Sequence, residues 1–459
     1  MKRCILFLFI FFCGCHRSVN LDEIILSQQN KILVDDEKYF RYALGDFSYH
    51  PPSAMSLLNN RALTVKTTNA WLKLGLIDTI DVLDYILPHF VNNTKDSTWR
   101  ELVQSTFSNQ IASHSIRTAQ DLLKFCNKIN NILKSKFIFN GRIDDSYGRE
   151  YLDILRNQTG TCITMTDFAN YTFRGLGIPV ATDFTPVWGN LNNGGHAWNR
   201  LLLKEEGRPF MGAESNLFNY EPLVVSKFKN GQISTTKIPP KVYRVNHYSS
   251  KSIHFFGKRV IDVTKEYVDV NDVKLDLIDK KKYRQLYLST FNKGKYVISA
   301  FGMNKNGTVI FKDMAVRLIY FPVVLEKPVP TCVDYPILVL KGEVRRMKPD
   351  FSHTLTVNVK YLSSLVQEQF RVLSNEGYEN QEERIQNLDS ICPRPIDKEG
   401  YELYYWDFGW RLHSTRKALN GNIKFSNVPN NSVYLIRNPQ NKIENCRPFI
   451  VRNNLISWF

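Results

Sequence analysis

The sequence predicts a multidomain α+β protein, with a helical N-terminal region, an α+β core and C-terminal all-β, sandwich-like domains. Its length of 459 residues is too great for one ordinary domain and suits about three. Hydrophobic residues make up 43% of the chain, and its 29 Phe offer ample material for buried cores. Apolar residues recur at helical spacing up to about residue 130 and alternate from about residue 240, which indicates helices first and strands later.

The start of the chain resembles an export signal. The basic residues Lys2 and Arg3 precede a short apolar run, which is typical of a secretory signal peptide and too short to span a membrane. The run ends in Phe-Cys-Gly-Cys, which resembles a bacterial lipobox with Gly14 before a lipid-bearing Cys15. We therefore expect residues 1–14 to be removed and Cys15 to tether the protein to a bacterial cell envelope, at the outer membrane or the cell surface. An ordinary signal peptide cleaved nearby is the alternative.

Residues 16–130 are predicted to form a helical region without chemistry of its own. The segment 78–90 is rich in aliphatic residues, and Thr118 offers an N-cap to an apolar stripe over residues 122–133. We expect these helices to support the core that follows and to form one wall of its cleft.

A cysteine opens the most informative segment, inside a predicted core of residues 131–236. Cys162 follows Gly160 and Thr161 and begins a run, residues 162–174, that has no Gly or Pro and carries apolar residues at helical intervals. A cysteine at a helix N-terminus meets unpaired backbone N–H groups and the positive end of the helix dipole, and both favour the thiolate. Cys162 is therefore a candidate nucleophile.

Two strands predicted after this helix carry an imidazole and a carboxylate. Gly and Pro at residues 175–179 end the helix, and a Gly- and Asn-rich turn precedes His196, the first residue of a strand over residues 196–203. A second strand over residues 209–214 ends in Glu214, and the two are expected to pair as a hairpin. A cysteine nucleophile needs such partners, because the imidazole takes and returns the thiol proton and the acid orients the ring.

These motifs, in this order, resemble the transglutaminase-like core, a branch of the papain-like thiol enzymes. The matching elements are Gly-x-Cys at residues 160–162, the stretch 174–179 that closes the helix, Gly-His-Ala-Trp at residues 195–198, and an acid late on the next strand. The resemblance implies a catalytic triad of Cys162, His196 and Glu214. The family usually has Asp followed by Pro in the third place, whereas Ser follows Glu214 here.

Neighbouring residues offer further roles. Asn216 is the substitute for Glu214, because an amide orients the imidazole in other thiol enzymes of this type. Trp188 and Gln158 are candidates for lining the substrate cleft or for assisting an oxyanion hole at the helix start. Each residue also has a structural alternative, since a cysteine is often a small buried hydrophobe and a single histidine is often a structural hydrogen-bonding group. The constellation as a whole carries the catalytic interpretation.

The last part of the chain is predicted to be all-β. Alternating segments separated by turn signals favour a sandwich-like domain over residues 241–327 and a second β domain over residues 331–459. Asn306-Gly307 is a strong signal for a hairpin turn. Two interpretations stay open for the aromatic cluster at residues 404–410, because alternate residues of a strand face the core, whereas exposed aromatic rings stack on sugars.

Charge and cysteine content limit the partners. Lys and Arg total 60 against 44 Asp and Glu, a net charge of +16, but the basic residues are scattered, which indicates a solvated basic surface and no nucleic-acid site. Five cysteines remain once the signal and the lipid-bearing Cys15 are set aside, and an oxidising envelope favours pairing, for which Cys392 with Cys446 is the candidate. No Cys or His cluster has zinc-ligand spacing, so we expect no metal and no cofactor.

The predicted function is a thiol-dependent hydrolase or acyltransferase that acts on an amide bond of a protein, peptide or glycoprotein through an acyl-enzyme. Hydrolysis is favoured, because the transglutaminase-like domains of exported bacterial proteins often resemble proteases. One alternative is an inactive transglutaminase-like scaffold whose β domains bind glycan or protein at the cell surface. Another is an amidase that acts on glycosylated asparagine, since deglycosylating thiol amidases share this core.

Overall fold

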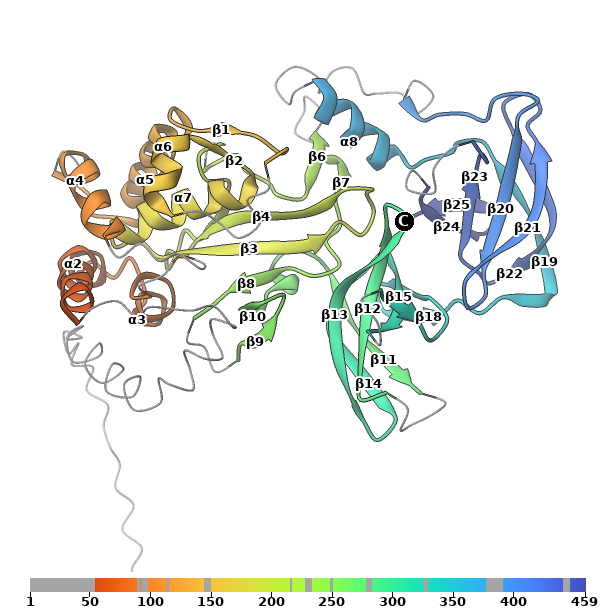
Figure 1. The fold of residues 1–459 in the computed structure, drawn as a ribbon, viewed down its shortest axis with the longest axis horizontal. Coiled ribbons are helices and arrows are strands. Elements are labelled where there is room, and N and C mark those ends of the chain that lie inside the picture. Colours follow the sequence, from red (N-terminus) through yellow and green to blue (C-terminus); the bar gives the residue numbers. More distant parts are fainter. Residues whose placement is uncertain are drawn as a thin grey trace, which may run out of the picture.

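A computed structural model describes most of the chain after its first 53 residues. The described residues are 54–88, 91, 98–112, 115–143, 150–214, 217–227, 233–247, 251–277, 283–325, 329–376, 391–440 and 446–459. The predicted signal peptide, the lipidation site Cys15 and the third-place candidate Asn216 lie outside these residues. Figure 1 shows helices at one end, a sheet beside them, and two strand-rich parts at the other end.

A layer of helices forms the N-terminal part of the described fold. Its members are α2 (Ala54–Lys73), α3 (Thr79–Asp81), the π-helical turn η1 (Val82–Ile86), α4 (Trp99–Ala112), α5 (Ala119–Lys134) and α6 (Tyr151–Asn157). The predicted N-cap of α5 is confirmed, because Thr118 and Asp121 each accept a hydrogen bond from the other's backbone N–H. The apolar faces of these helices share one hydrophobic core with the helix and sheet that follow.

The next helix packs on the long strands of a central sheet. Its elements are α7 (Cys162–Gly175), β3 (Val180–Val187), β4 (Gly194–Leu201), β5 (Arg208–Phe210), β8 (Tyr243–Val245), β9 (Ile253–Phe255) and β10 (Lys258–Asp262). The strand order is β5-β4-β3-β8-β10-β9, and β4 and β5 form the predicted hairpin. Because β8 pairs with β3, the sheet continues through residues 243–262, past the predicted domain junction near residue 240.

Shorter elements surround this sheet. They are β1 (Ile138–Phe139), β2 (Thr159–Gly160), β6 (Val224–Lys227), β7 (Ile233–Thr236), the 3-10 turn η2 (Thr264–Glu266) and α8 (Leu365–Glu376). The strands pair as β1 with β2 and β6 with β7, and α8 packs against β6 and β7. A helix from the C-terminal half of the chain thus covers part of the core (Figure 1).

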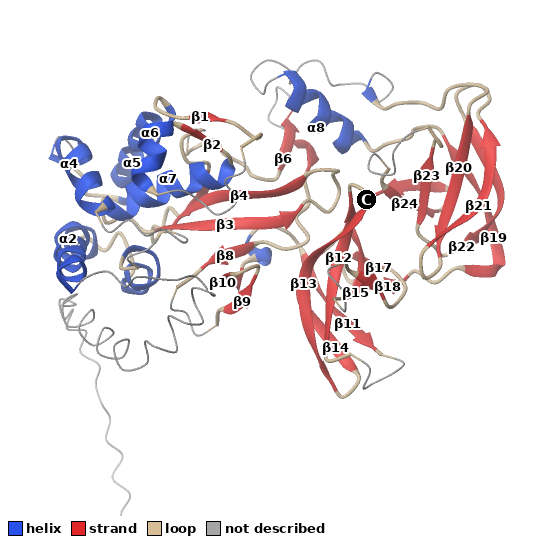
Figure 2. Ribbon diagram, viewed as in Figure 1, coloured by secondary structure: helices blue, strands red, loops and turns tan. Residues whose placement is uncertain are grey.

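The C-terminal region is rich in strands, as predicted, and Figure 2 shows its two parts. The first contains β11 (Val270–Asp276), β12 (Gln285–Asn292), β13 (Lys295–Lys305), β14 (Thr308–Ala315), β15 (Leu318–Val324), β16 (Thr331–Cys332), β17 (Ile337–Leu340) and β18 (Glu343–Arg346). The second contains β19 (Asp350–Val359), β20 (Gly400–Trp406), β21 (Trp410–Lys417), β22 (Ile423–Asn430), β23 (Tyr434–Arg437), β24 (Pro448–Arg452) and β25 (Leu455–Trp458). The sheet orders are β11-β14-β13-β12-β15-β17-β18, β19-β22 and β21-β20-β23-β24-β25.

Two sequence signals in this region have clear outcomes. The predicted hairpin turn is confirmed, because Asn306 and Gly307 have φ of 56° and 92° and join the paired strands β13 and β14. In the aromatic cluster, Trp406 is fully buried and its ring centroid lies 6.0 Å from that of Phe321, whereas Phe408 is exposed. Trp406 therefore serves the hydrophobic cluster that joins the two strand-rich parts.

The predicted disulfide between Cys392 and Cys446 is absent, since both are buried thiols. The reason is their separate packing: Cys446 belongs to the hydrophobic cluster around Trp406, and Cys392 does not. Within the described ranges, no helix combines the length and the apolar character needed to cross a membrane.

The loop between β3 and β4 is held by donors from the C-terminal region. The Asn292 amide, at the end of β12, donates hydrogen bonds to three loop carbonyls, those of Trp188, Leu191 and Asn193. The guanidinium of Arg447 donates to further loop acceptors, the Gly189 and Leu191 carbonyls and the Asn192 side chain. Burial lowers the pKa of Arg447 to about 9. These bonds join the loop before β4 to both strand-rich parts.

We expect Arg447→Met to lower the unfolding free energy by about 3 kcal/mol, because it leaves several buried loop acceptors without a donor. Thermal unfolding followed by circular dichroism would show a lower midpoint for this variant. Arg416→Met, at an exposed position of β21, is the matched control and should leave the midpoint unchanged. Equal midpoints for the two variants would contradict the role of Arg447.

Candidate active site

Cys162 is the first residue of α7, as the sequence predicts. Thr161 caps the helix, and its hydroxyl accepts a hydrogen bond from the Ile163 N–H at 3.2 Å. One turn later the Thr166 carbonyl accepts a hydrogen bond from the Asn199 side chain of β4 at 3.0 Å. The half-buried Cys162 therefore lies about 6 Å beyond this anchor, at the positive end of the helix.

The course of α7 over the sheet brings its first residue toward the start of β4. At the other end of the helix, Arg174 donates to the Val180 carbonyl, where β3 begins and β4 ends. From that point toward their N-termini, α7 and β4 run side by side. They pass the contact between Thr166 and Asn199, and they lead to Cys162 on the helix and to His196 on the strand. The structure brings Cys162 and His196 to the same end of the sheet.

Aromatic side chains enclose the His196 ring. Its centroid lies 6.2 Å from the Trp188 ring and 5.8 Å from the Trp198 ring, and Nε2 lies 3.1 Å from the Tyr220 hydroxyl. Burial, and secondarily the positive charge of Lys237, lower the pKa of His196 to about 3. The imidazole is therefore neutral at physiological pH and does not hold a permanent ion pair with a thiolate. So low a pKa also makes the ring a weak base, which acts in proton transfer only where the imidazolium is stabilised as it forms.

Tyr220 occupies the position that the sequence assigned to an acid. When the ring proton is on Nε2, the imidazole donates to the Tyr220 oxygen, and Nδ1 is the nitrogen that accepts a proton. Tyr220 lies 24 residues after His196, in the irregular stretch between β5 and β6. Sequence reasoning missed it because a tyrosine in such a stretch carries no local signal of this role.

The strand that was expected to carry Glu214 ends early. β5 stops at Phe210, because a Cβ at Gly212 would lie 2.6 Å from the Met165 carbonyl oxygen and Ala213 has a left-handed φ of 56°. Close packing on α7 thus breaks the strand. Glu214 follows on a turn, and the prediction of a strand through residue 214 is wrong.

Glu214 is exposed and does not supply the hydrogen bond of His196 Nε2, which goes to Tyr220. Protein atoms on one side of the turn desolvate the carboxylate enough to raise its pKa, while the positive charges of Lys134 and Lys237 act against this rise. The carboxylate of Glu214 therefore belongs to the electrostatic surroundings of the site.

Lys237 is a cation of the site that the sequence did not single out. Its ammonium lies 4.8 Å from the Trp188 ring centroid and 5.9 Å from that of Phe370 on α8. Burial lowers the pKa of Lys237 to about 8, against the opposing charge of Glu214. Among the described side chains none forms an ion pair with it. Its positive charge acts on His196 and on Glu214.

A satisfied polar network supports the wall behind the imidazole. Trp198 Nε1 donates to the Tyr267 hydroxyl at 3.1 Å, and that hydroxyl donates to the buried Asp183 carboxylate at 2.6 Å. Arg244 binds the same carboxylate with two hydrogen bonds of 2.7 and 2.8 Å, and it also pairs with Glu266. Such a bidentate buried pair fixes geometry, so the Trp198 ring is held firmly against His196.

The two residues predicted to line a cleft lie in different surroundings. Trp188 is only 2% exposed and lies between His196 and Lys237, so it walls the imidazole. Gln158 is exposed at the end of α6, with a left-handed φ of 52°, four residues before Cys162. Among the residues that the structure describes, no group of three or more His, Cys, Asp or Glu side chains is placed to hold a metal.

We expect Tyr220→Phe to slow the alkylation of Cys162 by iodoacetamide roughly tenfold, because the half-buried ring nitrogen loses a hydrogen bond worth about 0.5–1.5 kcal/mol. Rates would be followed by mass spectrometry of the Cys162 peptide. Tyr405→Phe, on β20, is the control. Glu214→Gln should change the rate less than Tyr220→Phe does. A larger effect of Glu214→Gln would indicate that Glu214, and not Tyr220, orients His196.

Comparisons with known proteins give distant similarities only. No protein-family model matches the chain, and no curated protein matches it. A structure from Cytophaga hutchinsonii, described as a candidate cysteine protease, is 13% identical over 36% of this chain and 50% of that chain, with a TM-score of 0.24. Red sea bream transglutaminase is 10% identical over 77% of this chain and 73% of that chain, with a TM-score of 0.22. TM-scores this low do not establish a common fold, so the functional argument rests on the surroundings of Cys162 and His196.

Proposed function

We propose that the protein is a thiol-dependent hydrolase or acyltransferase of amide bonds, with Cys162 as the nucleophile and His196 as the general base. The observation that carries this proposal is the convergence of the start of α7 with the start of β4, where a neutral imidazole is hydrogen-bonded to Tyr220. The substrate is an amide in a protein, peptide or glycoprotein. A lipid on Cys15 would tether the enzyme to a bacterial cell envelope, a part of the proposal that rests on the sequence.

The first half of the reaction forms a thioester. His196 takes the proton of the Cys162 thiol as the sulfur attacks the carbonyl carbon, which forms a C–S bond and a tetrahedral oxyanion. Backbone N–H groups at the start of α7 and the positive end of its dipole are suited to stabilise that oxyanion. The imidazolium then gives its proton to the leaving amine as the C–N bond breaks.

The second half restores the enzyme. Water or a second amine attacks the thioester carbonyl while His196 removes its proton, and the sulfur leaves as the new C–O or C–N bond forms. The imidazolium returns its proton to the sulfur of Cys162. Throughout, Tyr220 holds the ring orientation through Nε2.

Catalysis requires the Cys162 sulfur to come within hydrogen-bond reach of the imidazole. In the structure the ring's hydrogen bond goes to Tyr220. Catalytic hydrogen bonds are often long without substrate and tighten in the complex. The substrate is therefore expected to complete the pair.

The inactive-scaffold alternative is favoured by one observation. The acid predicted for the third place, Glu214, is exposed and does not bond His196 Nε2. A scaffold needs no reactive thiol, so the reactivity of Cys162 separates the two functions.

We expect an electrophilic peptidyl acyloxymethyl ketone to label Cys162 rapidly, and His196→Ala to slow that labelling by about 100-fold or more, the usual contribution of a general base. Peptide mass spectrometry of the full chain would identify the modified residue. Cys332, another half-buried thiol, is the internal control. Labelling of Cys162 no faster than Cys332 would support the scaffold.

The charge of Lys237 predicts a pH effect. Because its ammonium disfavours the imidazolium, Lys237→Met should raise the pKa of His196 from about 3, although burial keeps it below the ordinary value. The Cys162 labelling rate of the wild type should therefore show no histidine inflection near pH 6.5, while the variant's inflection moves upward. An inflection near pH 6.5 in the wild type would contradict a neutral, desolvated imidazole.

A further inference from the structure

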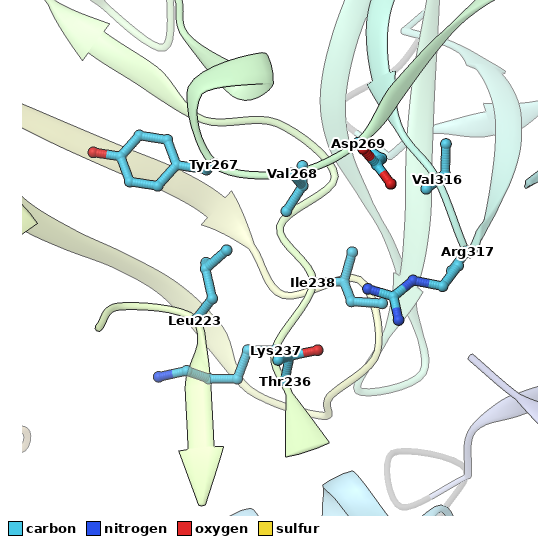
Figure 3. A pocket seen from close by; sticks show the side chains of 9 residues that line it. All are labelled: Leu223, Thr236, Lys237, Ile238, Tyr267, Val268, Asp269, Val316 and Arg317. Atoms are coloured by element: carbon cyan, nitrogen blue, oxygen red, sulfur yellow. The ribbon is translucent and has the colours of Figure 1, made fainter. Parts of the chain in front are cut away.

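A small cavity lies where the central sheet region meets the first strand-rich part. Its volume is about 220 Å³, and Figure 3 shows the side chains around it. Leu223, Ile238, Val268 and the ring of Tyr267 make much of the lining apolar. The volume is below the range of about 300–1,000 Å³ typical of drug-sized ligands, so the cavity suits a fragment the size of one amino-acid residue.

The charges around this cavity do not balance. Lys237 and Arg317 line it as cations, and Asp269 is the acid among its lining residues. The Asp269 carboxylate is already engaged by Lys341, with 3.1 Å between Nζ and Oδ2. In the described ranges neither Lys237 nor the Arg317 guanidinium has an ion pair, and Arg317 is exposed, so its guanidinium is open to an anion that enters from solvent.

The backbone at Arg317 adds a second observation. Arg317 lies in the two-residue connection between β14 and β15 and has a left-handed φ of 61°. This conformation is costly for a residue other than Gly, and such strain collects at functional positions. The turn is held by a hydrogen bond from the Arg317 N–H to the Val339 carbonyl. In Figure 3 the Arg317 side chain extends from this turn toward Ile238, across the cavity.

We propose that this cavity binds a carboxylate attached to an apolar group, with the carboxylate on Arg317 and the apolar group among Leu223, Ile238 and Val268. A guanidinium binds a carboxylate through two parallel hydrogen bonds, which gives direction as well as charge. A neutral ligand of the same shape gains only the apolar contact.

The cavity is joined to the candidate active site by two of its walls. The Tyr267 hydroxyl accepts a hydrogen bond from Trp198, whose ring packs on His196. Lys237 lines the cavity and also lies over Trp188, the other wall of the imidazole. The inference therefore deepens the proposed function and rests on it for its catalytic meaning: the preferred substrate carries a carboxylate near the amide that is cleaved.

Binding is tested on the full chain with Cys162→Ala, so that thiol chemistry plays no part. The probe is N-acetyl-L-leucine, and its uncharged partner is N-acetyl-L-leucinamide. By isothermal titration calorimetry we expect a Kd of about 1 mM for the acid and binding at least tenfold weaker for the amide. Arg317→Gln, which keeps a side chain at the same left-handed position, should remove the preference for the acid, whereas Arg416→Gln should keep it.

Equal binding of the acid and the amide, no binding of the acid, or an unchanged preference in Arg317→Gln would overturn the subsite. These results are independent of labelling at Cys162. If Cys162 is reactive but N-acetyl-L-leucine does not bind, the proposed function is supported and the proposed subsite is wrong. Acid binding with an unreactive Cys162 would support the binding site and remove its catalytic meaning.

Discussion

The candidate site depends on the loop at residues 188–193. This loop turns the chain from β3 into β4 and so sets the position of His196 near the start of β4. Its carbonyls are bound by Asn292 and Arg447, which come from the two strand-rich parts. The acceptors of the buried Arg447 guanidinium are neutral carbonyl and amide oxygens. This guanidinium therefore brings no carboxylate close to the imidazole. The C-terminal region therefore shapes the site directly, and a fragment ending near residue 240 would lack these donors.

The electrostatics of the site follow from which buried charges have partners. Arg244 has the Asp183 carboxylate, and its pKa is raised, so it serves as a fixed structural cation. Lys237 has no such ion pair among the described residues, and its pKa falls to about 8. The same desolvation acts on His196 and keeps the ring neutral. This environment disfavours a stable thiolate–imidazolium pair, and it requires that the imidazolium be stabilised when His196 takes up a proton.

The sequence predicts the features of this site that depend on local patterns. The run without Gly or Pro locates α7 with Cys162 at its start. The strand that carries His196 is also predicted, but β4 begins at Gly194, inside the predicted turn, and ends at Leu201 rather than at residue 203. Tyr220 and Lys237 reach the imidazole through tertiary packing, which no local pattern encodes. The early end of β5 also depends on tertiary packing, because it follows from the contact of Gly212 with α7. The lipid anchor at Cys15 stays a prediction.

The substrate specificity of such an enzyme would come from the junction between the core and the strand-rich parts. The walls of the imidazole belong to the core, whereas Arg317 comes from the first strand-rich part and Phe370 from a helix near the second. A shift of either part would move the cation that lines the cavity or the ring that covers Lys237, and through Asn292 and Arg447 it would also act on the loop before β4. In this proposal the residue that selects the substrate, Arg317, is distinct from the residues that carry out the thiol chemistry, so changes at residue 317 should alter substrate choice without altering the reactivity of Cys162.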